Sequence, residues 1–589
     1  MAIEGGSYTK YLIVLYNVKD MIWEYNDQDI ENIKKISKEY KIPQHITKIL
    51  LKRGIDTLEK INDFLYPNID KLEDPYCFEN MEKVVERILL SKEKNEKIFI
   101  YGDYDVDGIT ATAFLVIALK NVGINIDYYI PNRFEEGYGL SKKAIDAIKN
   151  KGGNLIITVD VGVNSINEIK YANEMGIDII ITDHHKAVEE EEKQNVLTIN
   201  PKLSDNYKFK DLSGAGVALK LAKAYYIKEN HDIERIYDYL DIVMIGTVAD
   251  VVTMVDENRT IIKEGLKTFK NTKIKGLEFL AKYLKLENKD LTTTDISFFI
   301  SPMLNALGRL GDSNIGVDFF ISKDEKSIFN IIEEMKKANK ERRVLEKLIY
   351  DEAMDMLDNV SDKNYIFLKS EKWHSGVIGV VASRLTGKYN KPTILLSTKD
   401  GIAKASCRSI DGISIFNILK KIPECFIRFG GHDLAVGFMA KEENLDKIET
   451  TIKDNLIITG VSKERKKIQI DLKMELEHLT DSFLSDIKRL APFGVGNPQP
   501  LVITENVYFK STKKFGIENR HFKTFIKKNN KSYSAVAFNL GYKFEKLLSE
   551  AQRFDIVYYP EKINYNGDEI LQLKIKDFKP VEDFEDIFI

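Results

Sequence analysis

The sequence of 589 residues contains little cysteine and no long hydrophobic run. Its three cysteines, Cys77, Cys407 and Cys425, provide neither a disulfide framework nor a Cys-x-x-Cys motif. No apolar stretch approaches the roughly eighteen residues of a membrane-spanning helix, and the N-terminus lacks the pattern of a signal peptide. We therefore expect a protein of a reducing cytoplasm, without membrane contact.

The chain also lacks a strong net charge. Its formal net charge is −4 and its pI is about 6.2. A protein that coats DNA by electrostatic attraction alone would be strongly basic, so this class is disfavoured, whereas an enzyme with a local basic channel is not. A hydrophobic content of 43% with 30% charged residues is typical of folded globular proteins.

The sequence does contain three carboxylates on alternate positions directly after a short apolar run. These are Asp103, Asp105 and Asp107, in the segment Gly-Asp-Tyr-Asp-Val-Asp-Gly. Three like charges this close repel one another unless cations lie between them. An EF-hand loop also begins Asp-x-Asp-x-Asp-Gly, but its twelfth position requires Glu, and Phe114 stands there. The pattern therefore favours a metal-binding loop between a strand and a helix over a calcium-binding EF-hand.

Further acidic and histidine residues follow other apolar runs. Asp160 and the run Asp183-His184-His185 each follow a predicted strand, and Asp250 ends an apolar helix. Singly, an Asp after a strand is commonly a helix N-cap and a His pair is commonly polar surface. Strands that alternate with helices predict a doubly wound parallel sheet, which binds ligands at the carboxyl ends of its strands. Together these residues predict one shared metal site. The predicted strands are 98–101, 124–130, 155–159, 177–182 and 196–199.

The C-terminal half predicts three further parts. Residues 322–359 predict one long helix, whose basic side faces either a phosphate backbone or solvent. A second α/β domain follows, in which glycines stand beside Arg, Ser and His, as a phosphate-binding loop requires. Beyond it, strand-like runs predict a β-barrel in which basic and aromatic residues alternate. Those aromatic residues either stack on bases or form the barrel core. They are Phe515, Phe522, Phe525 and Tyr533, among Lys513, Lys514, Arg520, Lys523, Lys527, Lys528 and Lys531.

Taken together, these motifs resemble the DHH phosphoesterase superfamily, and within it the single-strand-specific DNA exonucleases. The resemblance covers essentially the whole chain, although Met303 and Cys407 depart from the usual pattern. It implies a catalytic DHH domain, a DHHA1 domain and an oligonucleotide-binding (OB) fold, and 5′-to-3′ degradation of single-stranded DNA to nucleoside 5′-monophosphates in DNA repair and recombination. The matching segments are 103–108, 159–162, 183–185, 249–252, 305–310, 373–379, 430–432 and 492–498.

Five regions are predicted on this basis. They are an N-terminal helical region that packs on the catalytic domain (1–95), the DHH domain (96–312), a connecting helix (313–360), the DHHA1 domain (361–458) and the OB-like domain (459–589).

Hard carboxylates with imidazole and no thiolate favour two divalent cations, Mn²⁺ or Mg²⁺, over zinc. Such a pair would stabilise the attacking and leaving oxygens of a phosphodiester, so no separate protein base is assigned. The predicted metal ligands are Asp103, Asp105, Asp107, Asp160, His184 and Asp250, with Asp103 either a ligand or a neighbour of one. Resemblance places His185 on the scissile phosphate. The predicted catalytic residues are Asp105, Asp107, Asp160, His184, His185 and Asp250. Trp373 either stacks on the substrate or packs in the core. The predicted substrate-binding residues are His185, Asn305, Arg309, Trp373, His374, Arg408, Ser409, Gly430, Gly431 and His432.

Two alternatives remain beside a single-stranded-DNA exonuclease. Phosphodiesterases of the same superfamily act on short oligonucleotides or cyclic dinucleotides, but generally lack the C-terminal barrel. An inactive scaffold that threads single-stranded DNA would have lost the acidic and histidine residues. The expected partner is single-stranded DNA, admitted as one strand by a narrow passage between the two α/β domains. A single-stranded-DNA-binding protein and a RecQ-like helicase are further candidate partners, and a monomer is expected.

Overall fold

The computed structural model describes residues 21–26, 30–133, 136–137, 139–187, 196–287, 289–310, 312–357, 363–458, 467–548, 551–565 and 568–581. These residues form two compact units. The first lies within Pro67–Ser462 and includes Pro492–Asn497, and the second lies within Met1–Tyr66, Lys463–Ala491 and Pro498–Ile589. Within the described ranges, no helix is both long enough and apolar enough to span a membrane.

The first α/β domain is built on a five-stranded parallel sheet with the strand order β3-β2-β4-β5-β6. Apolar side chains are buried on both faces, as is usual for parallel sheets. β3 and β4 lie on opposite sides of β2, and a reversal of strand order of this kind leaves a crevice at the carboxyl ends of the strands. The strands are β2 (Lys97–Gly102), β3 (Ile126–Tyr129), β4 (Gly153–Val159), β5 (Asp178–Thr182) and β6 (Leu197–Ile199).

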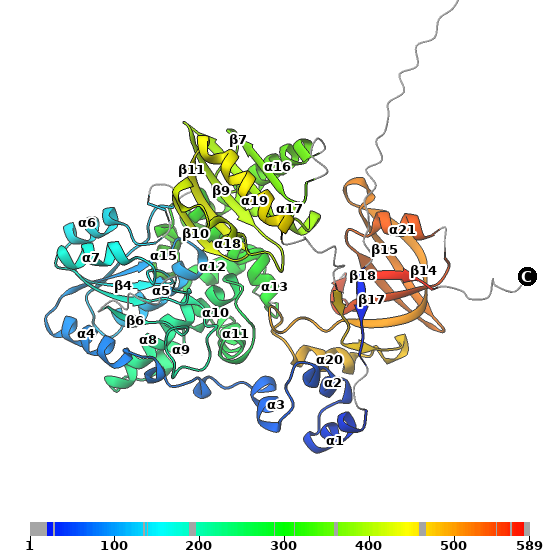
Figure 1. Cartoon of the computed structure of the whole chain (residues 1–589). Helices are drawn as coiled ribbons and strands as arrows, with labels where there is room; N and C mark the ends of the chain where they lie inside the picture. Colours follow the sequence, from blue (N-terminus) through cyan, green and yellow to red (C-terminus); the bar gives the residue numbers. More distant parts are fainter. Residues whose placement is uncertain are drawn as a thin grey trace, which may run out of the picture. The chain divides into compact units, whose positions relative to one another are not determined.

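Helices cover both faces of this sheet (Figure 1). α6 (Lys142–Asn150) and α7 (Ile166–Glu174) pack on one face. On the other face α5 (Val106–Lys120) is buried almost all round, because α8 (Gly214–Lys228) and α10 (Leu240–Ala249) pack against it. The remaining helices of this domain are η1 (Ile69–Lys71), η2 (Pro75–Cys77), α4 (Met81–Glu93), α9 (Glu234–Tyr237), α11 (Asp256–Phe269), α12 (Lys275–Leu284), α13 (Thr293–Asp295), η3 (Ile296–Ile300), α14 (Ser301–Leu310) and α15 (Asn314–Ile321).

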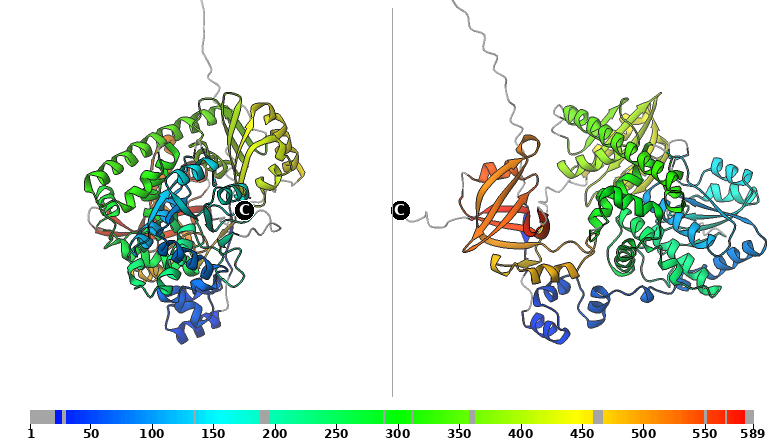
Figure 2. Two further views of the ribbon diagram at one scale, coloured as in Figure 1. Left: turned by 90° about the vertical axis from the view of Figure 1, so that its left-hand side faces the viewer. Right: turned by 180° about the vertical axis from the view of Figure 1, so that it is seen from behind.

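The long helix α16 (Glu325–Leu357) joins the two α/β domains, as Figure 2 shows. Ile328 and Met335 in its first half pack in the core of the first domain, whereas Ile349 and Ala353 pack in the core of the second. The second domain has a mixed sheet in the order β10-β11-β9-β8-β7. Its elements are β7 (Ile366–Ser370), α17 (Ile378–Tyr389), β8 (Thr393–Lys399), β9 (Ile402–Arg408), α18 (Ile415–Leu419), η4 (Pro423–Cys425), β10 (Phe426–His432), β11 (Ala435–Lys441), η5 (Glu442–Asn444) and α19 (Leu445–Ile458).

The second unit contains a closed five-stranded barrel, because the first barrel strand, β14, also pairs with β17. Its core includes an aromatic cluster of Phe509, Phe522, Phe544, Phe554 and Phe578. The barrel elements are β14 (Val502–Phe515), β15 (His521–Lys528), β16 (Lys531–Ala537), α21 (Gly541–Leu548), β17 (Phe554–Tyr565) and β18 (Asp568–Pro580). The other elements are β1 (Ile22–Glu24), α1 (Ile30–Tyr40), α2 (Gln44–Lys52), α3 (Leu58–Leu65), β12 (Lys467–Gln469), β13 (Leu472–Lys473), η6 (Leu476–His478), α20 (Asp481–Arg489) and η7 (Ile517–Asn519).

The predicted fold class is confirmed: a doubly wound parallel sheet, a long connecting helix, a second α/β domain and a C-terminal barrel. The described residues up to Tyr66 belong to the same unit as the barrel, and those from Pro67 onward belong to the other unit. Within the barrel unit, Trp23 on β1 donates a hydrogen bond to Asp577. The domain boundaries themselves stay predictions, and those after residues 360 and 458 adjoin residues outside the described ranges.

Candidate metal centre

The three alternating carboxylates lie where β2 ends and α5 begins. Asp105 is the N-cap of α5, and its Oδ1 accepts hydrogen bonds from the backbone N–H groups of Asp107 and Gly108. Asp107 lies in the first turn of α5 and accepts from the backbone N–H groups of Gly214 at 2.6 Å and Ala215 at 3.0 Å. Those two groups begin α8, and a helix N-terminus favours a negative charge. The local fold therefore orients two of the carboxylates without neutralising them.

Two glycines allow neighbouring helices to approach these carboxylates. A Cβ atom on Gly214 would lie 2.8 Å from Oδ1 of Asp160, and one on Gly246 in α10 would lie 2.7 Å from Oδ1 of Asp107. Neither position accepts a larger residue without moving a carboxylate. Neither glycine was predicted from the sequence. The small-residue run Ser213-Gly-Ala-Gly could have indicated Gly214, and Gly246 is a single glycine in an apolar run.

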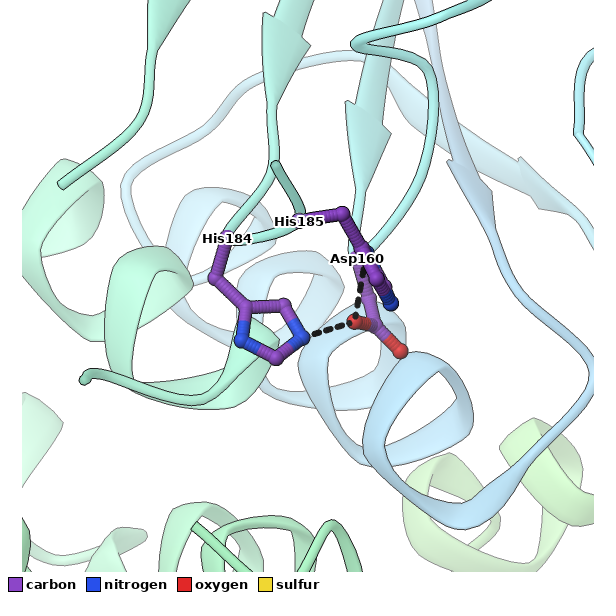
Figure 3. Close-up of side chains that lie close together, drawn as sticks. All are labelled: Asp160, His184 and His185. Carbon is purple, nitrogen blue, oxygen red and sulfur yellow. Dashed lines mark ion pairs between the residues drawn. The ribbon is translucent and has the colours of Figure 1, made fainter. Parts of the chain in front are cut away.

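Asp160 and the histidine pair lie at the ends of the neighbouring strands β4 and β5. Asp160 has a left-handed backbone conformation, with φ of 62°, which is uncommon outside glycine. Its Oδ1 lies 3.1 Å from Nε2 of His184, and that nitrogen lies 3.6 Å from Oδ2 of Asp250. His184 and His185 converge on the Asp160 carboxylate from adjacent positions in one segment (Figure 3).

The potential ligand atoms form three overlapping groups, and within each group all atoms lie within 4.8 Å of one another. Asp160 belongs to two groups and His184 to two, so the groups form one continuous patch. The structure thus brings together all six residues predicted as ligands, and it adds His185. The groups are Asp160 with His184 and His185, Asp107 with His184 and Asp250, and Asp103 with Asp105 and Asp160.

The electrostatics of this patch fit a bound cation. Burial, followed by repulsion from Asp105, raises the pKa of Asp103 to about 8 and that of Asp107 to about 7. Burial and Asp107 raise the pKa values of Asp160 and Asp250 well above the usual range of a carboxyl group. Among the described residues, four buried atoms of the patch have no hydrogen-bond partner: Oδ1 of Asp103, Oδ1 of Asp160, Nε2 of His184 and Oδ2 of Asp250. Buried polar atoms without partners are costly, and divalent cations bound to the three groups would satisfy them.

His184 is suited to metal binding and His185 to another role. Burial and the neighbouring His185 lower the pKa of His184 to about 3, so its imidazole is neutral, as a metal ligand must be. His185 donates a hydrogen bond from Nδ1 to Oδ1 of Asp183 at 2.7 Å. Burial lowers the pKa of His185, but this bond and the charges of Asp183, Asp103 and Asp105 together raise it overall. Burial raises the pKa of Asp183, but the bond and the charges of the two histidines together lower it to about 2. The His432 ring stacks on His185, with 5.5 Å between the ring centroids and 6° between the planes.

One turn after β6 holds the backbone of both histidines. Asn200 Nδ2 donates to the carbonyl of His185 at 2.9 Å, and Lys202 Nζ donates to the carbonyl of His184 at 2.5 Å. The turn is itself fixed, because the Lys202 N–H donates to Asn200 Oδ1 at 2.8 Å. Sequence reasoning missed this turn, since Asn-Pro-Lys has no motif that would distinguish it from any surface turn. Side chains that orient metal ligands in this way commonly affect metal affinity strongly.

Four arginines gather beside the metal centre. Burial, followed by the charges of Arg133, Arg342 and Arg408, lowers the pKa of Arg309 to about 10. Arg309 is oriented by a 3.0 Å hydrogen bond to the carbonyl of Gly376, and Arg408 by bonds to Ser383 and to the Cys407 carbonyl. Arg342 lies on the predicted long helix, whose basic side was expected to face either a phosphate backbone or solvent. Arg133 was not predicted, because it lies in no recognisable motif.

The other predicted substrate residues are distributed as follows. Asn305 lies beside Arg309 on one cavity wall, His374 accepts a hydrogen bond from the N–H of Gly376, and the buried Ser409 lies directly after β9. Gly430 and Gly431 lie on the edge strand β10, which ends at His432.

Trp373, which was predicted to bind substrate, lies in a core. Its side chain is only 3% exposed and donates its indole N–H to Glu352, so no face of its ring is open to a base. The side chains of Met303 and Cys407 are also buried in apolar clusters.

Comparison with known protein families gives matches in three regions of the chain. The DHH family, N-terminal domain, matches residues 97–247. The DHHA1 domain matches residues 362–457, and the RecJ OB domain matches residues 470–577.

Curated relatives match over most of the chain. The single-stranded-DNA-specific exonuclease RecJ of Bacillus subtilis (strain 168) is 33% identical over 561 residues, which cover 95% of this chain and 70% of that protein. The protein of the same name from Haemophilus influenzae is 30% identical over 536 residues, which cover 87% of this chain and 92% of that protein.

Solved structures show the same fold. The crystal structure of RecJ in complex with Mn²⁺ from Thermus thermophilus matches with a TM-score of 0.82 and 22% identity, covering 96% of this chain and 80% of that chain. A crystal structure of exonuclease RecJ bound to manganese matches with a TM-score of 0.57 and 28% identity, covering 64% of this chain and 95% of that chain.

The raised carboxyl pKa values predict a pH-dependent stability of the metal-free protein. A folded-state pKa above the unfolded value of about 4 means that stability is lost as pH rises toward the folded value. In EDTA the melting temperature should therefore fall between pH of about 6 and about 8, and Mg²⁺ should raise it more at the higher pH. Asp160→Asn should make the melting temperature in EDTA depend less on pH, because it removes one of the repelling charges. A melting temperature that is independent of pH and of Mg²⁺ would contradict the assignment.

Asn200→Ala should weaken divalent-metal binding about 10- to 100-fold, because the backbone of the histidine pair loses its support. Asn164→Ala is the matched control, since Asn164 Nδ2 donates at 3.1 Å to the carbonyl of Lys186, the residue that follows the pair. Mn²⁺ titration, followed by calorimetry and by activity, measures the difference. Equal metal affinities in the two variants would show that the turn does not position the ligands.

Proposed function

The chain belongs to the RecJ family of single-stranded-DNA-specific exonucleases, and we propose that its metal centre hydrolyses the phosphodiester bonds of single-stranded DNA from the 5′ end. The observation that supports this most directly is the patch of six predicted ligands, four of which present buried atoms without a hydrogen-bond partner among the described residues. An inactive scaffold would have no reason to keep such a costly arrangement.

The proposed metal ligands are Asp103, Asp105, Asp107, Asp160, His184 and Asp250, and His185 is close enough to replace or assist one of them. Two Mn²⁺ or Mg²⁺ ions bound there would stabilise negative charge on a phosphate and lower the pKa of water. The relatives with solved structures contain these same ions. The protein's own contribution is to hold the carboxylates apart at fixed positions, through the amides of α8 and the caps of α5.

His185 is proposed to donate a hydrogen bond to the scissile phosphate. Its Nδ1 is held by Asp183, and the proposed contact with the substrate is through Nε2. The hydrogen bond to Asp183 favours the protonated imidazole, whose positive charge suits a phosphate oxygen. The parallel ring of His432, from the second α/β domain, limits rotation of His185. In this way the Gly-Gly-His segment contributes to the site in the first domain.

The arginines are proposed to bind the phosphates of the strand, with Arg408 at the 5′ phosphate. A Cβ atom on Gly379 would lie 3.3 Å from Oγ of Ser406 and 3.4 Å from Nη2 of Arg408. The absence of that side chain leaves space at the first turn of α17, where backbone N–H groups favour an anion. Arg133 is close enough to Asp103 to lower the pKa of that carboxyl, and Arg309 is close enough to Arg408 and Asp105 for their charges to shift its pKa. A phosphate there would relieve the mutual repulsion of the guanidinium groups.

The barrel is proposed to bind the strand through the outer face of β14 and β15. Tyr508 is paired with Lys527, Lys510 with Phe525, and Lys513 with Lys523, and these side chains are exposed. Phe525 is 50% exposed and can stack on a base, whereas Phe522 belongs to the core. Two lysines directly opposite each other are unfavourable in isolation, and a polyanion would remove that cost. A cytoplasmic location, a monomeric state, a single-stranded-DNA-binding protein and a RecQ-like helicase as partners remain proposals.

The polarity and the metal site can be tested in one experiment. The wild-type protein with Mn²⁺ should release the 5′ label of a single strand before its 3′ label and should leave a blunt duplex largely intact. Asp160→Ala should lower the rate at least about a hundredfold, because it removes a ligand from two groups. Asp446→Ala, an exposed position in the first turn of α19, serves as the control. Full activity of Asp160→Ala, or release of the 3′ label first, would contradict the proposal.

Arg408→Gln should remove a preference for a 5′ phosphate. The wild-type protein should act about 10- to 100-fold faster on a 5′-phosphorylated strand than on the same strand with a 5′ hydroxyl, because a charge-assisted hydrogen bond is lost with the phosphate. The variant should degrade both strands at the slower rate. Arg384→Gln, which lies on the same helix α17 but stacks on Tyr350, should keep the preference. A preference that survives in Arg408→Gln would assign the 5′ phosphate to another site.

A further inference from the structure

A π-helical turn, η3, presents two phenylalanines to solvent beside the metal centre. Phe298 is 67% exposed, and its neighbour Phe299 is also exposed, whereas Ile296 and Ile300 of the same turn are fully buried. Turns of this kind are rare and frequently lie at functional sites. Core packing explains the two isoleucines, and it leaves the exposed aromatic rings without an explanation.

The residues that flank these phenylalanines line a cavity of about 210 Å³. Its wall contains Arg309 and Arg342, the side chains of Ser297 and Ser301, and several apolar groups. The Ser301 hydroxyl is buried and has no hydrogen-bond partner within the described part of the chain. A buried polar group of this kind calls for a ligand. The cavity therefore offers in one place two guanidinium groups, an unused hydroxyl and an apolar surface. Of the two guanidinium groups, that of Arg342 is also paired with Glu346 at 2.9 Å.

Val251 forms part of the same wall and directly follows the proposed metal ligand Asp250. Its φ angle is 63°, which is a rare conformation for a β-branched residue, and its side chain is 63% exposed. Strained backbone of this kind is found mostly at functional sites, where the surrounding structure holds it in place. Here the strain holds an apolar side chain at the cavity next to the metal centre.

Positive charge beside exposed apolar and aromatic groups fits an unpaired polynucleotide strand, whose phosphates need cations and whose bases need flat apolar partners. A protein partner would not require two guanidinium groups so close together, whereas successive phosphates do. The cavity also adjoins the metal centre. Arg309 lines the cavity together with Arg342, and it is close enough to Asp105 for the two charges to interact.

We propose that Phe298 and Val251 form a base-stacking platform for the nucleotides that follow the scissile phosphate, with Arg309 and Arg342 holding the phosphates between them. This proposal rests on the function proposed above and assigns a base-binding site to it. The platform also explains a preference for single strands, because the bases of a duplex are already stacked on one another and paired. Only an unpaired base can leave its neighbours and lie on Phe298.

The test combines a protein variant with a modified strand. A set of 5′-phosphorylated oligothymidylates carries one abasic site at successive positions from the 5′ end. Binding is measured by fluorescence anisotropy in EDTA, and digestion is measured with Mn²⁺. For the wild-type protein, an abasic site at the platform position should weaken both about 5- to 100-fold, since a stacked base is lost. Phe298→Ala should weaken the binding and digestion of the intact strand by a similar factor. With this variant, the abasic strand should be bound and digested as well as the intact strand is.

Phe329→Ala is the matched control. Phe329 is 58% exposed in the same unit, and it lies thirteen residues before Arg342 on α16, about 20 Å along the helix axis. This variant should bind and digest every strand as the wild-type protein does. Val251→Ala should resemble Phe298→Ala with a smaller loss.

The outcomes separate this proposal from the proposed function. If Phe298→Ala and the abasic site weaken binding independently, so that their effects multiply, the platform is wrong even though the exonuclease stands. If Phe298→Ala binds all strands as the wild-type protein does, the platform is also wrong. If the wild-type protein digests no single strand, the proposed function fails, and the binding measurements in EDTA still decide the platform.

Discussion

The repulsion among buried carboxylates is the constraint on which the rest of the structure depends. Asp103, Asp107, Asp160 and Asp250 are crowded into one patch where burial alone disfavours their charges. Backbone N–H groups at the start of α8 offset part of this cost, and a divalent cation would offset the remainder. The folded protein therefore strongly favours cation binding at the carboxyl ends of β2 and β4, where the reversal of strand order provides space.

Several features from different parts of the chain hold the crowded carboxylates and the histidines in place. Gly214 and Gly246 permit two helices to approach the carboxylates, and Asp160 adopts a left-handed conformation beside them. The turn at Asn200 and Lys202 fixes the carbonyls of the histidine pair, so that the imidazoles meet the carboxylates at set positions. Each feature has a cost in isolation. Together they hold a preformed set of ligands, which spares the site from reorganising when a metal ion and a phosphate bind.

The second α/β domain supplies the opposite charge. Arg408 and His432 face the first domain, where Arg309 already lies close to the carboxylates. A strand of DNA between them would present its phosphates to arginines on one side and to metal ions on the other. The exposed aromatic groups at η3 and on the barrel face then account for the bases, which need apolar partners once they are unpaired.

The sequence by itself determined the strand-helix alternation, the long helix, the barrel and the residues that would seek a cation, because periodicity and local charge crowding are properties of neighbouring residues. It placed Trp373 among the substrate residues, but the tertiary structure buries this ring against Glu352. Only the tertiary structure decided that β1 pairs with β12, that Gly214 and Asn200 support the metal ligands, and that the exposed Phe298 follows a serine that lines the same cavity as Val251. These depend on contacts between segments distant in the chain, which packing selects and local sequence does not record.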